Sequence, residues 1–379
     1  MKFQSLRLRN FRNYRDLALE FPPGVVVFLG QNGQGKTNLM EAFHFLLRGE
    51  SFRPTSIDSL IQHEGDQVAK ASVIEGRLSQ KGLTHDIRVI IGDSKKSSLW
   101  NNNRVTSAEL TRHFPIVLFS PESLAAIKEG PDQRRKLLDD VVLTHSTASV
   151  KILKDFNRAL KTRNRVLRDM KKGLTAERQG QLLLESLDSS YLPLAAELTV
   201  ARLGALKALH GDFVAAAAYV LDLPAVDISV EYLISSQNAY TWSRSDILTA
   251  MHNRAVELRG KEALTGVSLV GPQRHDIRIL FSGKDSRFFC SQGQQRALIL
   301  SFKMAQILYH HRSYQVYPFL LLDDVLSELD PTRRTNLVKF LRDIPAQIFL
   351  TTTDLSFSMD FGDRRLSVFQ IEKGRVVKT

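Results

Sequence analysis

The 379-residue sequence has one cysteine, Cys290, and no long apolar run. A single cysteine cannot form a disulfide within the chain, which indicates a reducing compartment. No segment approaches the roughly 18 consecutive apolar residues of a membrane-spanning helix. Basic residues near the start, Arg7, Arg9, Arg12 and Arg15, leave no room for the apolar core of a signal peptide. We therefore expect a soluble, cytoplasmic protein with no membrane-spanning segment.

Acidic residues are fewer than basic ones, with 40 Asp and Glu against 52 Lys and Arg, which gives a net charge of +12. This excess favours a polyanionic partner, either nucleic acid or an acidic membrane surface. Hydrophobic residues at 43% and charged residues at 24% exclude general disorder. The length suggests two or three domains of about 150 residues each.

Hydrophobic periodicity divides the chain into two ends that mix strands and helices and a middle that is largely helical. In the first end, we expect strands within 3–21, at 25–29, 68–78, 86–91, 99–105 and 116–119, and a helix from the glycine-rich segment to about residue 48. In the middle, helical patterns run from 131 to about 222 and over 246–259, with a strand at 228–233. In the last part, we expect strands at 277–281, 318–322 and 347–351, and helices at 293–311 and 331–342. The sequence thus predicts an α/β domain, residues 1–120 and 262–379, interrupted by a helical insertion, residues 121–261.

The glycine-rich segment 30–37, GQNGQGKT, matches G-x-x-x-x-G-K-[ST] in full and lies between an expected strand and an expected helix. Its glycines let the backbone turn N–H groups toward phosphate oxygens, and the helix N-terminus adds the positive end of a dipole. The alternative is a glycine-rich turn that binds no ligand, but such a turn does not require every residue of the G-x-x-x-x-G-K-[ST] pattern. Lys36 is expected to reach the β- and γ-phosphates of a nucleotide, and the Thr37 hydroxyl to coordinate Mg²⁺. The expected nucleotide contacts are Gly30, Gln31, Asn32, Gly33, Gln34, Gly35, Lys36, Thr37 and Asn38.

Two adjacent carboxylates, Asp323 and Asp324, end the apolar run that begins at Phe319. A strand placed beside the strand of the glycine-rich loop would deliver Asp323 to the Mg²⁺. Asp324 would then lie where a base orients or deprotonates the attacking water. The alternative is a strand whose exposed end is merely acidic.

Ser291 precedes a strong helical pattern in the segment SQGQQR. A serine there is a good N-cap, and the cap alone explains it. In the alternative interpretation, the same hydroxyl and the Gly293 amide would form a second anion site, able to hold a γ-phosphate.

The order glycine-rich loop, Ser-x-Gly-Gln and apolar-Asp-Asp is typical of the ATP-binding-cassette superfamily. Within it, the chain resembles the RecF family of bacterial recombination-repair proteins from end to end. The resemblance is carried by LRLRNFRNY at 6–14, GQGKTNLMEA at 33–42, LFSPE at 118–122, GPDQRRKLLD at 130–139, SQGQQR at 291–296 and LLDDVLSELD at 321–330.

The resemblance implies an ABC-type ATPase head related to those of Rad50 and SMC proteins. Such a head has a P-loop α/β core with an antiparallel β subdomain, interrupted by a helical lid domain. Two copies would close on two ATP molecules and bind DNA, as a duplex or at single/double-strand junctions, and slow DNA-dependent hydrolysis would reopen the dimer. Residues 327–330 would lie at the same interface, and the ATP held by residues 30–37 of the partner copy would be contacted by Ser291, Gln292, Gly293 and Gln294.

The family's role, by the same resemblance, is recombinational repair and replication restart. RecR and RecO are the implied partners, and together they place the RecA recombinase at single-strand gaps.

Three features, two single residues and one short segment, depart from related patterns. Asp324 stands where most cassette ATPases have the longer glutamate, and Thr353 stands where they usually have histidine. Both residues look normal for RecF and favour slow turnover. The segment 271–276, GPQRHD, differs from its RecF counterpart at two residues, so we assign no role to Gln273 and expect His275 to be surface or structural.

A basic stripe follows the helical pattern after residue 150. Its members recur at spacings of 3 and 4, which places them on one helix face: Lys151, Lys154, Arg158, Lys161, Arg165, Arg168 and Lys172. From 151 to 172 there are nine basic and two acidic residues. Like charges in this number repel one another, so we interpret the stripe as a contact for the DNA backbone without sequence readout. The alternative is a solvent-exposed helix face whose long side chains cover apolar surface. The shorter cluster Arg134-Arg135-Lys136 is expected to be plain helix surface.

Other functions stay open. A transporter motor fits poorly, because Thr37 and Ser291 lie 254 residues apart. A second alternative is a structural head of the SMC or Rad50 type. Against it, the heptad pattern of the helical insertion continues for only about three heptads. A module that binds ATP without hydrolysing it is a third.

Overall fold

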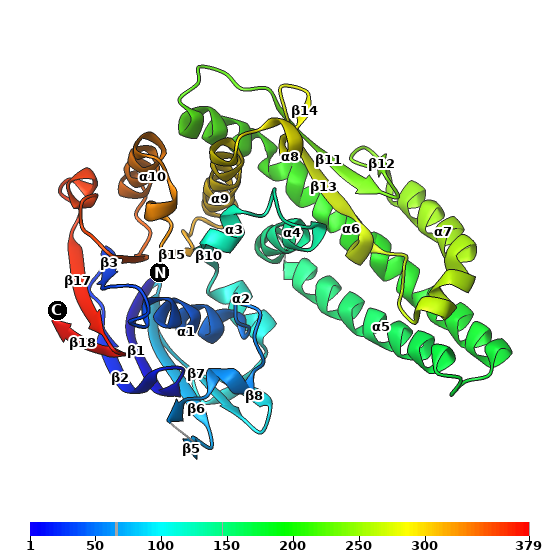
Figure 1. Cartoon of the computed structure of the whole chain (residues 1–379), viewed down its shortest axis with the longest axis horizontal. Coiled ribbons are helices and arrows are strands. Elements are labelled where there is room, and N and C mark those ends of the chain that lie inside the picture. Colours follow the sequence, from blue (N-terminus) through cyan, green and yellow to red (C-terminus); the bar gives the residue numbers. More distant parts are fainter. Residues whose placement is uncertain (65–66, 146, 379) are drawn as a thin grey trace. The chain divides into compact units, whose positions relative to one another are not determined.

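The computed structural model describes residues 1–64, 67–145 and 147–378 (Figure 1). The chain forms two compact units. The first comprises Met1–Ala125, Ala215–Pro224 and the chain from Arg296 onward, and the second comprises Ala126–Val214 and Ala225–Gln295. Residues 262–295 therefore pack with the second unit. These units are defined by packing alone, so the domain boundaries expected from the sequence stay a prediction. In the described part of the chain, no helix is long and apolar enough to cross a membrane.

A six-stranded, mainly parallel sheet carries the chemistry-bearing loops of the first unit. Its order is β10-β15-β16-β3-β17-β18, and only the last pair is antiparallel. The central strands are continuous apolar runs, because both faces of the sheet are covered. The strands are β3 (Val25–Leu29), β10 (Ile116–Phe119), β15 (Phe319–Asp323), β16 (Ile348–Thr352), β17 (Leu366–Glu372) and β18 (Arg375–Lys378).

The strand order corrects one expectation. The aspartate strand β15 is not beside the loop strand β3, because β16 lies between them. Asp323 nevertheless reaches the loop, since all three strands run in parallel and their carboxyl ends meet at one edge of the sheet.

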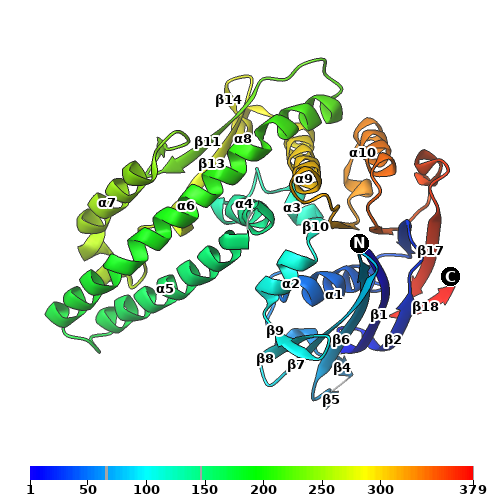
Figure 2. The same cartoon turned by 180° about the vertical axis from the view of Figure 1, so that it is seen from behind.

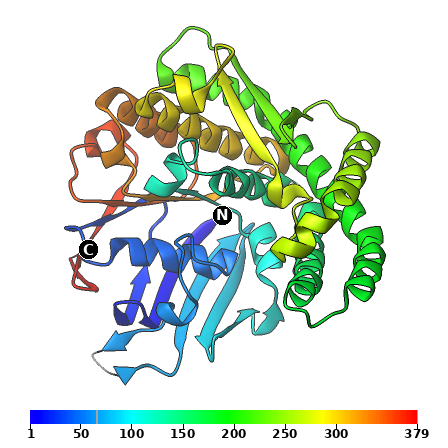
Figure 3. The ribbon, with the colours of Figure 1, turned by 45° about the vertical axis from the view of Figure 1, so that its right-hand side comes forward.

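A second sheet of the first unit is antiparallel, with the order β2-β1-β6-β7-β8-β9. Helix α1 (Lys36–Arg48) contacts strands of both sheets, and Figure 3 shows it lying along the antiparallel one. Phe43 of α1 joins the two layers, with its ring 4.9 Å from that of Phe3 and 4.3 Å from that of Phe349. The strands are β1 (Lys2–Phe11), β2 (Tyr14–Glu20), β6 (Ser72–Gln80), β7 (Leu83–Gly92), β8 (Lys95–Trp100) and β9 (Asn103–Val105).

The single strand expected at 99–105 is wrong. Asn101 and Asn102 both have positive φ, 47° and 66°, and form a two-residue turn between β8 and β9. Asparagine is among the few residues that accept this backbone region readily. The expected strand 68–78 is likewise divided between β5 (Gln67–Val68) and β6. Elements of the first unit that the sequence did not predict include β4 (His63–Glu64), α2 (Ser107–His113), α3 (Pro121–Leu124), β17 and β18.

The second unit is built around long helices. Helices α5 (Thr147–Lys171) and α6 (Glu177–Leu221) lie side by side (Figure 2). Helix α7 (Arg244–Thr265) packs against α5. A four-stranded sheet has the order β12-β11-β13-β14. The remaining elements are α4 (Pro131–His145), β11 (Ile228–Ile234), β12 (Gln237–Asn238), β13 (Asp276–Phe281), β14 (Lys284–Asp285) and α8 (Ser286–Phe289). Helix α9 (Gln292–Tyr314) starts in this unit and continues in the first, which also holds α10 (Pro331–Asp343).

Two buried arginines tie the second unit together. Arg163 of α5 donates to Asp188 of α6 at 2.8 Å and to Glu262 of α7 at 2.8 and 2.9 Å. Arg134 is only 4% exposed and forms a bidentate pair with Asp276, both bonds 2.8 Å long. The expectation that Arg134 is plain helix surface is therefore wrong, because its partner lies 142 residues away and no local pattern announces it.

Candidate nucleotide-binding site

The glycine-rich loop leaves β3 and is held from several sides. Gly30 N–H donates to the Thr352 carbonyl at 3.2 Å, and the Tyr14 hydroxyl donates to the Gly35 carbonyl at 3.0 Å. Gly35 has φ of 111°, a backbone region that side chains rarely adopt. A Cβ there would also lie 2.4 Å from the Asn13 amide nitrogen. Glycine is thus required at this point by both backbone and space.

Helix α1 starts at Lys36 with Gly35 as its N-cap and receives no side-chain cap. The N–H groups of its first turn therefore point out of the helix without a protein side chain to accept them. An uncapped helix start behind a glycine loop is an anion site in physical terms.

Lys36 is buried, at 6% exposed, and its ammonium donates to the carbonyls of Gly30 and Gln31 at 2.7 and 3.0 Å. Burial lowers the pKa of Lys36, and the charges of Asp324 and Asp323 oppose that shift. The cation is therefore held over the loop and faces two carboxylates.

Thr37, Asp323 and Thr351 meet at the edge of the parallel sheet. The Thr37 hydroxyl donates to Asp323 Oδ1 at 3.1 Å, and the Thr351 hydroxyl donates to the same oxygen at 2.9 Å. Asp323 is 4% exposed. Burial raises the pKa of Asp323 to about 6, against the opposing hydrogen bonds from Thr351 and Thr37.

Asp324 follows directly but turns away from the strand with φ of 52°. Its N–H donates to Thr351 Oγ1 at 2.8 Å, and its carbonyl accepts from the Ser327 hydroxyl at 2.7 Å. Among the described residues, none forms a hydrogen bond or ion pair with its carboxylate. That carboxylate is free to engage a water molecule.

The donor set fits Mg²⁺ bound together with a phosphate. No group of three His, Cys, Asp or Glu side chains able to hold a metal occurs within the described ranges. Mg²⁺ prefers one or two protein oxygens with substrate phosphates and water, and the paired oxygens of Thr37 and Asp323 provide that set.

A second cluster supports α1 and was missed by the sequence reasoning. Glu41, fully buried, accepts from Arg12 through two bonds of 2.8 Å and from the Ser51 hydroxyl at 2.5 Å. Arg53 also pairs with Glu41 and donates to Asn38 Oδ1 at 2.7 Å. Burial alone would raise the pKa of Glu41, but these hydrogen bonds hold it below its usual value. The sequence signal for this cluster was the charged residue Glu41 inside the expected helix at GKTNLMEA.

The segment 291–294 belongs to the second unit, whereas the loop and both aspartates belong to the first. Ser291 and Gln294 form a reciprocal cap of α9, with Gln294 N–H donating to Ser291 Oγ at 3.2 Å and Ser291 N–H donating to Gln294 Oε1 at 2.9 Å. Ser291 and Gln292 are exposed, and Gly293 is half-buried. The N-cap interaction accounts for a serine at position 291. It leaves the N-terminal end of α9 accessible.

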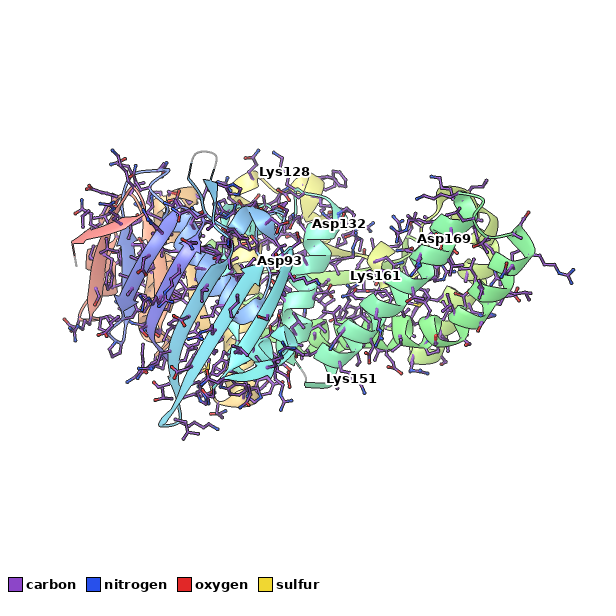
Figure 4. The ribbon with its side chains drawn as sticks, turned by 90° about the horizontal axis from the view of Figure 1, so that it is seen from below. Asp93, Lys128, Asp132, Lys151, Lys161 and Asp169 are labelled. Carbon is purple, nitrogen blue, oxygen red and sulfur yellow. The ribbon has the colours of Figure 1, made fainter. Side chains whose placement is uncertain are left out.

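The basic stripe is present as expected from its spacing. All seven of its side chains are exposed, and Figure 4 labels Lys151 and Lys161 along α5. Arg165 is 81% exposed and lies 3.9 Å from Asp169, a weak surface pair. Lys172 follows the last residue of α5, and its N–H still donates to the Arg168 carbonyl at 3.0 Å. The opposite face buries Phe156, Arg163 and Leu167.

His275 and Gln273 have structural surroundings. His275 is buried and lies 3.0 Å, Nδ1 to hydroxyl oxygen, from Tyr232. Gln273 donates to the Tyr191 hydroxyl at 3.1 Å and to the Val270 carbonyl at 2.8 Å. Both side chains are engaged within the second unit.

Known proteins resemble this chain over its full length. The family described as RecF/RecN/SMC N terminal domain matches residues 2–377. The DNA replication and repair protein RecF of Heliobacterium modesticaldum is 34% identical over 385 aligned residues, which cover all of both chains. A solved structure of the recombination mediator protein RecF with ATP, from the RecFOR pathway, is 30% identical, with a TM-score of 0.85, and the match covers 100% of this chain and 97% of that one.

The Smc head domain from Pyrococcus furiosus shares the fold alone, at 18% identity and a TM-score of 0.53, with 98% of this chain and 94% of that chain covered. Taken with the full-length relatives, these likenesses show that the chain belongs to the RecF family, whose fold is that of an ABC-type ATPase head.

Proposed function

We propose that this chain is an ATP-gated DNA-binding protein of recombinational repair and replication restart, reset by slow hydrolysis of ATP. The observation that carries the proposal is the contact of Thr37 with Asp323 beside the uncapped start of α1. This contact places a buried carboxylate beside a helix N-terminus that can bind phosphate. These two groups are the minimum that a site needs to hold a nucleotide with its metal. The relative described as RecF-ATP supports ATP as the ligand.

The loop residues Gly30 to Asn38 hold the nucleotide in this proposal. Backbone N–H groups of the loop and the first turn of α1 bind the phosphates, and Lys36 exchanges its carbonyl partners for the terminal phosphates. Thr37 and Asp323 provide the metal oxygens. Mg²⁺, when bound, supplies charge neutralisation on the phosphates.

Asp324 acts on the attacking water. Its carboxylate has no hydrogen-bond partner within the described chain, so it can orient or deprotonate that water. Because aspartate is shorter than glutamate and Thr353 has no imidazole, hydrolysis is slow and serves to reset a switch.

Two copies of the chain complete the site. Ser291, Gln292, Gly293 and Gln294 contact the nucleotide held by the other copy, since Ser291 and Gln292 are exposed and lie at an accessible helix start. A ligand shared by two chains has the differential affinity that a nucleotide-driven switch requires.

Duplex DNA and single/double-strand junctions are the proposed polyanionic partners of the basic stripe. RecR is the direct protein partner, and RecO and RecA act in the same pathway in the cytoplasm. The description of the solved relative as a mediator in the RecFOR pathway supports these partners.

Fluorescence anisotropy of a labelled DNA duplex tests whether ATP controls DNA binding. The protein is titrated into the duplex without nucleotide, with ADP, and with ATP and Mg²⁺. We expect ATP to tighten DNA binding at least tenfold over ADP. Equal affinity in the three conditions would contradict an ATP-gated function.

A further inference from the structure

We infer that Thr351 is a positioning residue: its hydroxyl sets the path of the backbone from Asp323 to Asp324 and thereby aims the Asp324 carboxylate. Thr351 is the fourth residue of β16 and is 1% exposed. The inference deepens the hydrolytic step and rests on the proposed function.

Only one arrangement of hydrogens satisfies the Thr351 hydroxyl. The Asp324 N–H can only donate, so Thr351 Oγ1 accepts from it at 2.8 Å. The single hydroxyl hydrogen is then free to point at Asp323 Oδ1, 2.9 Å away. Thr351 therefore bridges the side chain of one aspartate and the backbone of the next.

The bridge acts where the backbone leaves the strand. At φ of 52°, Asp324 adopts the left-handed region that most residues avoid. Both polar groups of its backbone are held by hydroxyls, the N–H by Thr351 and the carbonyl by Ser327 at 2.7 Å. The backbone is thus fixed from both sides, while the carboxylate forms no hydrogen bond or ion pair among the described residues. A fixed backbone with a free carboxylate is the arrangement expected of a group that must point in one direction.

Strand register places Thr351 at this point. Thr351 is directly opposite Asp323 in the parallel ladder of β15 and β16, and opposite Phe28 of β3 on the other side. The adjacent Thr352 carbonyl accepts from Gly30 N–H at the start of the loop. The end of β16 therefore links the glycine-rich loop to the aspartate pair. The sequence could not reveal this link, since it predicted a strand at 347–351 but not the place of that strand between β3 and β15.

Single-turnover hydrolysis of Thr351→Val and Thr351→Ser tests the inference. Valine keeps the shape and loses the hydroxyl, whereas serine keeps the hydroxyl. We expect valine to lower the hydrolysis rate at least tenfold with less than a twofold change in ATP affinity, and serine to stay within about threefold of wild type. Thr111→Val is the matched control, because it removes a buried threonine hydroxyl of the same unit that donates to the Leu47 carbonyl, away from the aspartate pair.

A double-mutant comparison distinguishes positioning of the Asp324 carboxylate by Thr351 from a general effect of Thr351 on the site. In an Asp324→Asn background, Thr351→Val should lower the remaining rate by less than twofold, because there is no carboxylate left to aim. A full tenfold loss in that background would overturn the inference, as would an unchanged rate in Thr351→Val alone.

Hydrogen exchange provides a readout that does not depend on activity. In the nucleotide-free protein, Thr351→Val should speed exchange of the Asp324 amide at least tenfold, and Thr351→Ser should not. Unchanged exchange in the valine variant would overturn the inference. If wild type fails to hydrolyse ATP, the proposed hydrolysis fails by itself, and the exchange result still decides whether Thr351 holds Asp324.

Discussion

Thr37 and Asp323 are 286 residues apart in the chain, yet the Thr37 hydroxyl lies 3.1 Å from Asp323 Oδ1. Thr37 follows the loop that leaves β3, and Asp323 ends β15, two strands away in the same sheet. Their contact brings two residues of the proposed metal site together at the start of α1. The residues proposed to hold the metal and the phosphates therefore lie together within one chain.

Asp324→Asn should uncouple hydrolysis from binding. Asparagine accepts the left-handed backbone of this position as readily as aspartate, so folding is preserved. It is a poor base, so we expect single-turnover hydrolysis to fall more than tenfold while ATP affinity changes less than threefold. A rate equal to wild type would exclude Asp324 as the group that acts on water.

Charge reversal on the stripe should weaken DNA binding without affecting ATP. We expect the triple change of Arg158, Lys161 and Arg165 to glutamate to lower duplex affinity at least tenfold. If six phosphates are contacted, wild-type log affinity should fall with log salt at a slope of about −5, and the variant's slope should be shallower.

The matched control for the stripe changes three exposed lysines on other helices to glutamate: Lys207, Lys261 and Lys339. It alters the net charge equally, so similar losses in both triple variants would assign DNA binding to overall charge rather than to α5.

Arg163→Met should destabilise the second unit strongly. Removing the cation leaves Glu262 buried with an uncompensated charge and leaves Asp188 with Arg259 as its cationic partner, at a cost of about 3–5 kcal/mol. Arg165→Met on the same helix is the control, because its exposed side chain should change the free energy of unfolding by less than about 0.5 kcal/mol. Urea unfolding of both variants measures the difference, and equal effects would refute a structural role for the Arg163 network.

His275 should make stability depend on pH. Burial lowers the pKa of His275 well below its usual value, with the charges of Arg202 and Arg135 acting in the same direction. The folded protein therefore keeps His275 neutral, while the unfolded chain binds a proton below about pH 6.5. Stability from this residue is complete above that pH and is lost as the pH falls, by up to about 1.4 kcal/mol per pH unit.

Urea unfolding at pH 5.5 and 7.5 measures this loss, which should be smaller in His275→Gln than in wild type. His252→Gln, which changes an exposed histidine of the same unit, should keep the wild-type difference. The same pH dependence in all three proteins would show that His275 does not stay neutral in the fold.

Local patterns predicted the features that depend on neighbouring residues. The loop 30–37, the start of α4 at Pro131 and the basic face of α5 follow from spacing and composition alone. The Asn101–Asn102 turn was also a local signal, and it was overlooked within an alternating run.

Features that depend on long-range pairing could not be predicted in this way. Arg134 becomes buried because Asp276 meets it from a distant strand, and Thr351 gains its contacts because β16 inserts between β3 and β15. Strand order and remote ion pairs are set by how the whole sheet and the helices pack, so no window of sequence contains them.

Sedimentation velocity tests the central proposal, which is that ATP is shared by two copies of the chain. Wild type is compared without nucleotide, with ADP and with ATP, in the presence of duplex DNA. Ser291→Arg and, as control, Ser186→Arg at an exposed serine of the same unit are measured alongside. We expect a dimer only with ATP in wild type and Ser186→Arg, and a monomer that still binds ATP in Ser291→Arg. A wild-type chain that stays monomeric at saturating ATP and duplex would contradict the account.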